Sequence, residues 1–134
     1  MLNDKNLDMI GLNENELLHY IGIEASSDEE LIAAAKNLKE KIPARIDLHT
    51  ADFTCSISEN CIVVPSLDLP NIFRATGAGD AWNAGNIFGE LLCFANDERL
   101  LFASCVAGCY ISSPNPIHPS LDDVIQFLTS LGKI

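Results

Sequence analysis

The residues best suited to chemistry lie in one stretch, RATGAGDAWNAG, at positions 74–85. Gly77, Ala78 and Gly79 lead directly into Asp80, and an apolar, helix-like run follows. The first turn of a helix leaves backbone N–H groups without partners, and glycines let an anion approach them closely. Because a carboxylate there would repel a phosphate, we expect Asp80 to face a group that gives up a proton. Asp80 is therefore predicted to accept the proton of a substrate hydroxyl, while nearby amides stabilise charge on a transferring phosphoryl group.

A simpler interpretation of the same stretch competes with this one. Thr76 or Asp80 could cap the helix, and the glycines could form an ordinary turn. For a bare GxGD the simpler interpretation is favoured, because short glycine-rich motifs are weak signals. The longer string is more specific, since it sets the order of small, acidic and aromatic residues over ten positions.

The string TGAGDAWNAG closely resembles the signature of the ribokinase, or PfkB, family of sugar and nucleoside kinases. That signature reads approximately D-T-x-G-A-G-D-x-F-x-A-G. Trp82 stands in for the usual aromatic residue, and the matching residues are Thr76, Gly77, Ala78, Gly79, Asp80, Ala84 and Gly85. The resemblance implies that Gly77, Ala78 and Gly79 form an anion hole for phosphate and that Asp80 is the catalytic base.

A second motif lies upstream, in the run NENE at positions 13–16. Taken alone, Asn13 and Glu16 are typical of a capping box at the start of a helix. They also match the N-x-x-E motif of the same family, which helps to organise magnesium and phosphates. The resemblance thus implies Mg²⁺ as cofactor, bound through water by Glu16, and a nucleotide bound with help from Asn13.

Two departures from the family pattern concern the nucleotide site. The family often has an aspartate near a monovalent-cation site six residues before the base, and Arg74 occupies that position. Its positive guanidinium would repel a potassium ion at that site. Arg74 is therefore either a solvated loop charge, or a residue whose guanidinium replaces the cation or contacts phosphate. Thr76 is expected to contact the nucleotide as well. The strand 44–50 should be followed by a T-x-G nucleotide loop, of which Thr50 is present and the glycine is missing. LNENEL and LHT are also similar to ADP-dependent archaeal sugar kinases, so both ATP and ADP stay open as the phosphate donor.

Length and composition limit the other possibilities. The 134 residues suit one domain, 1–134, and the chain is 48% hydrophobic with 20% charged residues, as in globular proteins. Its formal net charge of −11 argues against binding to nucleic acid or to anionic membranes. The five cysteines are scattered, which favours buried thiols in a reducing cytoplasm over zinc or disulfides.

Hydrophobic periodicity predicts an α/β fold. Strands are expected at 7–12, 44–50, 53–58 and 61–67, and helices at 13–22, 25–42, 78–95, 97–113 and 120–131. Trp82 and Phe88 are expected in the core, His49 in a structural role at a strand end, and His118 in a surface loop. The resemblance implies the C-terminal portion of a ribokinase-like three-layer sandwich, a sheet flanked by helices, with the lid and the N-terminal half absent. In this family the N-terminal half supplies most of the sugar-binding residues.

These observations predict a carbohydrate kinase of the PfkB type, which transfers a phosphoryl group from ATP or ADP to a sugar or nucleoside hydroxyl. The alternative is a truncated, non-catalytic module that binds a nucleotide or another protein. The first strand resembles the middle of a larger sheet, and an open sheet edge invites pairing. The expected partners, besides nucleotide and sugar or nucleoside, are therefore a second copy of the chain or the missing N-terminal half.

Overall fold

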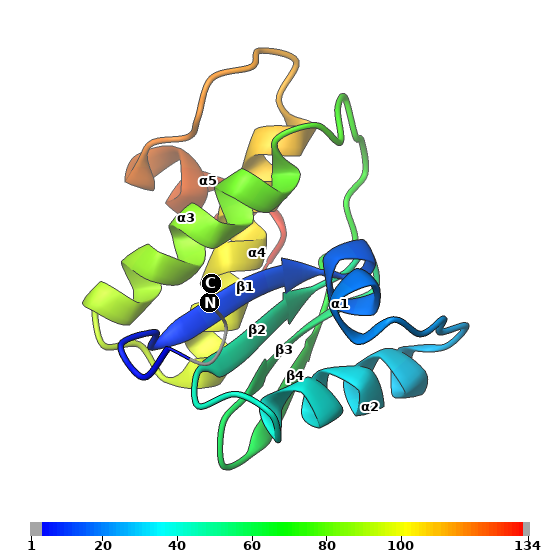
Figure 1. Ribbon diagram of the computed structural model, residues 1–134. Helices are drawn as coiled ribbons and strands as arrows, with labels where there is room; N and C mark the ends of the chain where they lie inside the picture. The colour runs from blue at the N-terminus through cyan, green and yellow to red at the C-terminus, as the bar shows by residue number, and fades with distance from the viewer. Residues whose placement is uncertain (1–3, 133–134) are drawn as a thin grey trace. The chain divides into compact units, whose positions relative to one another are not determined.

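The computed structural model describes residues 4–132 (Figure 1). The chain forms two compact units that divide between Ser66 and Leu67. The expectation of a single domain over 1–134 stays a prediction. Within residues 4–132, no helix has both the length and the apolar character needed to cross a membrane.

The first unit is built on a mixed sheet of four strands, in the order β1-β2-β3-β4. β1 runs parallel to β2, and the other two pairs are antiparallel. The strands are β1 (Met9–Asn13), β2 (Arg45–His49), β3 (Phe53–Ile57) and β4 (Cys61–Pro65). Two helices, α1 (Glu14–Ile21) and α2 (Asp28–Lys39), connect the parallel strands. The predicted hairpin is confirmed, and Pro65 lies on an edge strand, where its missing N–H costs least.

The caps of α1 lie where the sequence predicts, and so does the N-cap of α2, but α2 ends at Lys39, three residues before the predicted end at residue 42. The side chain of Asn13 caps α1, and Gly22 ends that helix in the left-handed conformation, at φ 71°. The hydroxyl of Ser27 accepts a hydrogen bond from the Glu30 amide, and acidic residues fill the first turn of α2. These caps satisfy backbone groups that the helices themselves leave unpaired.

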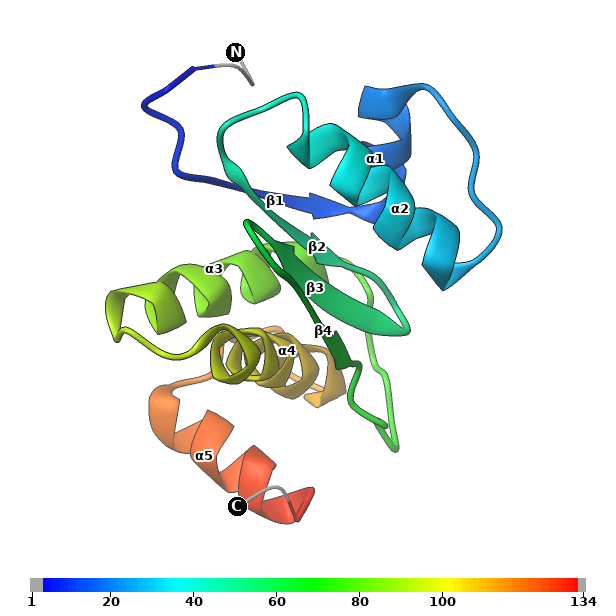
Figure 2. The same ribbon diagram turned by 90° about the horizontal axis from the view of Figure 1, so that it is seen from below.

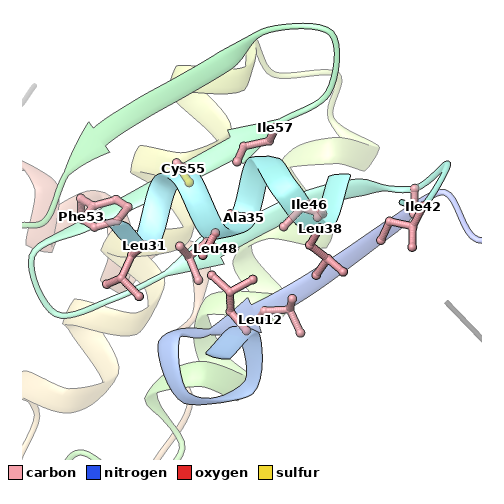
Figure 3. Packing of buried hydrophobic residues seen from close by; sticks show 13 residues of the cluster. Leu12, Leu31, Ala35, Leu38, Ile42, Ile46, Leu48, Phe53, Cys55 and Ile57 are labelled. Atoms are coloured by element: carbon pink, nitrogen blue, oxygen red, sulfur yellow. The ribbon is translucent and has the colours of Figure 1, made fainter. Parts of the chain in front are cut away.

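The core of the first unit lies between α2 and one face of the sheet (Figure 3). Alternate strand residues point toward the helix, as the two-residue period of a strand requires. Burial of each large aliphatic side chain there stabilises the fold by about 1.5–3 kcal/mol. The main contributors are Leu31, Ala35, Leu38, Ile46, Leu48, Phe53, Cys55 and Ile57, all at most 9% exposed. This packing holds the ends of β1 and β2, and with them Asn13 and His49.

The second unit consists of three helices, in which α4 packs against both α3 and α5 (Figure 2). They are α3 (Ala78–Leu91), α4 (Asn96–Ser112) and α5 (Leu121–Ser130). The predicted helix over 78–95 is shorter than expected, because Cys93 takes a positive φ of 59° and turns the chain toward α4.

Small residues let α3 approach α4 closely. A Cβ atom at Gly85 would lie 2.9 Å from the Cα of Ala103, closer than real Cβ atoms come to backbone. On the same face Trp82 is 3% exposed, as predicted, and its indole N–H donates to Ser104 Oγ at 3.4 Å. Buried Arg99 binds the side-chain oxygens of Asn86 and Asn96, which ties the far end of α3 to α4.

The prediction that Phe88 lies in the core is wrong. Its side chain is 42% exposed, with its ring 6.0 Å from that of Phe102. The face of α3 toward α4 is taken by small residues and Trp82, so the larger aliphatic residues Ile87 and Leu91 also turn outward, at 51% and 75% exposed. The sequence pattern indicated a deeply buried helix, but the buried residues of α3 lie on one side of it.

Candidate functional site

The start of α3 has the geometry of an anion-binding turn. Gly77 is the N-cap residue, in the left-handed conformation with φ 85°, and the helix proper begins at Ala78. Within the described chain, neither Thr76 nor Asp80 makes a side-chain hydrogen bond to this turn, so the simpler interpretation of them as caps is wrong. Asp80 lies in the first helical turn with its side chain exposed. The amides at this helix start therefore have no capping side chain to compete with an anion.

One amide of this turn is already in use. The N–H of Ala78 donates to the carbonyl of Ala75 at 3.1 Å, and the Gly77 carbonyl accepts from Ala81 at 3.0 Å. These bonds fix the shape of the turn. They also mean that Gly77 and Gly79 are better placed than Ala78 to donate to a bound anion.

Gly77 is required by its surroundings as well as by its backbone angle. A Cβ atom there would lie 3.0 Å from Tyr110 Oη and 3.1 Å from Tyr110 Cε1. Any other residue would be strained by the positive φ and would also press on this ring. The aromatic ring of Tyr110 thus forms one wall of the turn.

Arg74 is not a solvated loop charge. Its guanidinium donates to the carbonyls of Tyr110 at 2.8 Å, Pro114 at 2.9 Å and Asn115 at 3.2 Å. The guanidinium carbon also lies 5.3 Å from the centre of the Tyr110 ring. The ring of the exposed residue His118 stacks on the same Tyr110 ring, with 4.8 Å between the ring centres. Because the guanidinium already donates to three carbonyls, few of its N–H groups remain for the predicted contact with phosphate.

In the first unit, Asn13 and Glu16 form the capping box. Asn13 Oδ1 accepts from the Glu16 amide, and Glu16 Oε2 accepts from the Asn13 amide, both at 2.9 Å. No group of three or more His, Cys, Asp or Glu side chains in residues 4–132 could hold a metal ion. Mg²⁺ is commonly held by one or two carboxylates together with water and substrate phosphates. The single exposed carboxylate of Glu16 fits that kind of site, and it does not fit a cage made of protein alone.

Two more residues lie beside the capping box at the carboxyl ends of β1 and β2. His49 is the register partner of Asn13, and burial lowers the pKa of its imidazole, which the Glu16 carboxylate partly opposes. The Thr50 hydroxyl donates to the Phe53 carbonyl at 2.9 Å and accepts from the Phe53 amide at 3.0 Å. Thr50 thus closes its own turn, which explains how the loop forms without the family's glycine. Ligands of α/β proteins commonly bind at such strand ends.

The residues predicted from sequence therefore fall into two clusters, one in each unit. The first consists of Asn13, Glu16 and Thr50, which His49 joins. The position of His49 directly before Thr50 was the only signal for it in the sequence. The second consists of Arg74, Thr76 and the turn 77–80.

Comparisons with known proteins agree with this architecture. The chain is 33% identical over 105 residues to 1-phosphofructokinase of Haemophilus influenzae, a match that covers 77% of this chain and 34% of that protein. It is 27% identical over 123 residues to the bifunctional protein HldE of Aliarcobacter butzleri, covering 90% of this chain and 26% of that protein. The chain thus spans about a quarter to a third of the length of these curated relatives.

The fold is shared with solved kinases. The structure of Arabidopsis thaliana ribokinase complexed with ribose and ATP superimposes with a TM-score of 0.81 at 19% identity, over 90% of this chain and 40% of that one. No family model matches the sequence. The sequence relatives and the ribokinase-like α/β fold together support a relationship of this chain to part of a ribokinase/PfkB-family kinase.

Proposed function

We propose that the chain carries the phosphoryl-transfer part of a kinase that acts on a hydroxyl of a sugar or nucleoside. The observation that carries this proposal is the start of α3, where glycine caps the helix and Asp80 stands exposed in the first turn. The kinship to 1-phosphofructokinase and to a ribokinase that binds ribose and ATP supports a sugar substrate. The donor is ATP or ADP, and ATP is the nucleotide named for the ribokinase.

In this proposal Asp80 takes the proton of the attacking hydroxyl as its oxygen bonds to the transferred phosphorus. The bond from that phosphorus to the leaving oxygen of the nucleotide breaks at the same time. The amides of Gly77 and Gly79, with a smaller share from Ala78, donate to the oxygens of the transferring group. The positive end of the α3 dipole acts on the same charge.

The first cluster would serve the nucleotide. Glu16 would hold Mg²⁺ through water, while Asn13 and Thr50 would contact the donor. In the second unit, Thr76 precedes the anion-binding turn and is proposed as a phosphate contact there. When bound, the metal supplies positive charge that neutralises phosphate oxygens. The capping box keeps the Glu16 carboxylate at the carboxyl end of β1, where such a ligand would lie.

The proposal is tested by isothermal titration of the purified chain with Mg·ATP and with Mg·ADP. Asp80→Asn is the matched variant, because it removes the base and keeps the shape of the side chain. We expect the variant to bind nucleotide as wild type does, and to lose at least about 100-fold in phosphoryl transfer wherever wild type shows transfer to a sugar. Transfer that survives Asp80→Asn would reject Asp80 as the base.

A second function is favoured by one specific observation. The outer face of α3 is apolar and exposed from Ile87 to Leu91, and Asp80 lies at its beginning. A module that docks through this face, with a second copy or with a separate N-terminal half, needs no catalysis of its own. If the folded chain binds neither nucleotide, this reading replaces the kinase. In either case we propose a cytoplasmic protein, because the scattered cysteines suit a reducing compartment better than a disulfide framework.

A further inference from the structure

Three backbone carbonyls converge on one cation in the second unit. Arg74 Nη1 donates to the carbonyls of Tyr110 and Asn115, and Nη2 donates to the carbonyl of Pro114. The partners are 36 to 41 residues away in the chain, so these bonds join the segment before α3 to the last turn of α4 and to the loop that follows it. A backbone bond between the Phe73 amide and the Ile111 carbonyl, at 2.9 Å, runs beside them.

The charge balance of this cluster is unusual for an arginine. No ion pair of the described chain includes Arg74, so carbonyl dipoles and the face of the Tyr110 ring are its counterparts. Carbonyl oxygens that point at one place repel one another unless a positive charge lies between them. Rings of carbonyl oxygen are also the ligands that alkali-metal cations take in proteins. The cluster therefore has the donor chemistry of a monovalent-cation site, filled by a side chain.

The cluster also shapes the anion-binding turn. Tyr110 accepts from Arg74 through its carbonyl, faces the guanidinium with its ring, and lies against Gly77 with its hydroxyl edge. A shift of Tyr110 would move the wall against which Gly77 is packed. Arg74 is thus a positioning residue that acts on the turn through Tyr110, to which it is hydrogen-bonded and which packs against Gly77.

We propose that Arg74 is a tethered cation. It occupies a carbonyl cage and holds Tyr110 against Gly77, so that the turn keeps its shape without a dissolved monovalent cation. Two consequences follow. The stability of the wild-type chain does not depend on which monovalent cation is present. Shortening Arg74 opens the cage and creates a site for a free cation such as K⁺.

The test compares Arg74→Ala with Arg74→Met in thermal unfolding. Alanine leaves room in the cage, whereas methionine fills much of the arginine's volume without charge. Each protein is measured in potassium chloride and in N-methylglucamine chloride at equal ionic strength, since the organic cation is too large for the cage. We expect Tm of wild type to be equal in the two salts. Both variants should lose stability, and K⁺ should raise Tm of Arg74→Ala alone, on the order of 3–6 °C.

A second arm uses the guanidinium ion at low millimolar concentration as a chemical replacement for the lost side chain. It should raise Tm of Arg74→Ala and leave Arg74→Met unchanged, an outcome that a purely packing role of Arg74 would not produce. The proposal is overturned if wild type is itself stabilised specifically by K⁺. It is also overturned if Arg74→Ala responds to neither ion. Should Arg74→Ala fail to fold in both salts and with guanidinium, the cage does not accept a free cation and the proposal fails.

This inference does not rest on the kinase function. The readouts are unfolding temperatures, so they are unaffected by whether Asp80 performs catalysis. Nucleotide titration of Arg74→Ala in the two salts then separates the two ideas. Binding that returns with K⁺ supports both, whereas a K⁺-dependent Tm without any nucleotide binding supports the tethered cation and rejects the phosphate site.

Discussion

At the scale of single residues, the candidate site residues differ in whether their side chains already make hydrogen bonds within the chain. Asn13, Glu16 and Thr50 all use their side chains to close local turns. Asp80 makes no such bond and is exposed at the start of α3. The Asp80 carboxylate makes no hydrogen bond that stabilises the turn, although its negative charge interacts favourably with the positive end of the α3 dipole. This difference supports the proposal that Asp80, rather than Glu16, accepts the proton.

His49 gives a prediction for pH dependence. Burial lowers the pKa of its imidazole below the ordinary value of 6.5, so the unfolded chain binds this proton more tightly than the folded one. The free energy of unfolding is therefore unaffected by protonation of this imidazole above pH 6.5, and it decreases as the pH falls from 6.5 toward the pKa of His49 in the folded chain. His49→Gln should therefore flatten the dependence of unfolding free energy on pH in this window, as measured by urea denaturation.

Glu16→Gln is the matched variant for His49, because glutamine keeps the capping box and removes the charge that favours the protonated imidazole. It should move the His49 titration, followed by NMR of the ring protons, to lower pH. A His49→Gln variant with the wild-type slope would contradict this account, as would a titration that Glu16→Gln leaves in place.

Prediction from sequence succeeded at the residue scale where the signal was local. The ten-residue string TGAGDAWNAG and the cap at Asn13 are contained in consecutive residues, and the structure places both at helix starts. The partners of Arg74 could not be predicted, because they are backbone carbonyls more than 35 residues away whose position depends on the packing of α4. Charge alone left three roles open for that arginine.

At the scale of elements, the close crossing of α3 and α4 depends on Gly85. A Cβ atom there would meet backbone at Ala103 and the side chain of Val106, at 2.9 and 3.0 Å. Gly85→Ala should thus destabilise the chain by about 1–3 kcal/mol in urea unfolding, despite the better helix propensity of alanine. The signature glycine at this position is explained by packing between helices.

Gly89→Ala is the matched control for this crossing. It lies one turn further along α3, and its added Cβ would meet side-chain atoms of Arg99 and Phe94, at 3.0 and 3.4 Å. Side chains can shift where backbone cannot, so we expect a loss below that of Gly85→Ala. Equal losses would mean that both substitutions act through the helix itself and that the crossing is not the cause.

The elements themselves were predicted well because each carries its own boundary signals. Caps at Asn13, Ser27 and Ser120 and the turn at Glu59–Asn60 are properties of short segments. Which side of α3 is covered is not such a property. Its apolar residues extend around the helix, and the burial of Trp82 but not of Phe88 follows from the face that α4 occupies.

At the scale of the whole molecule, two surfaces lack the partners that their chemistry calls for. β1 is an edge strand whose outer side has no neighbour among the described strands, although it pairs in parallel with β2. Parallel sheets are normally buried, with other strands or helices around them. The outer face of α3 is apolar from Ile87 to Leu91. The relatives, of which the matches cover only 34% and 26%, contain further chain that could cover such surfaces.

The last prediction concerns the outer face of α3. Exposed apolar side chains at Ile87, Phe88 and Leu91 lie on one side of the helix, and such a patch favours association between copies of a protein. Sedimentation velocity over a range of concentrations should show that the chain self-associates, and Leu91→Glu should shift it toward the monomer. Because Leu91 is 75% exposed, its replacement should change the unfolding free energy by no more than about 0.5 kcal/mol.

Ala33→Glu on α2 serves as the control for Leu91→Glu, since it adds the same charge at an exposed helical position away from the apolar patch. The net charge of the chain is already −11, so repulsion between copies would affect both variants alike. If Ala33→Glu shifts the chain toward the monomer as strongly as Leu91→Glu does, the added negative charge explains both results and the α3 face is not the association surface. If only Leu91→Glu does so, the outer face of α3 is a docking face, and the turn that is proposed to be catalytic begins the same helix.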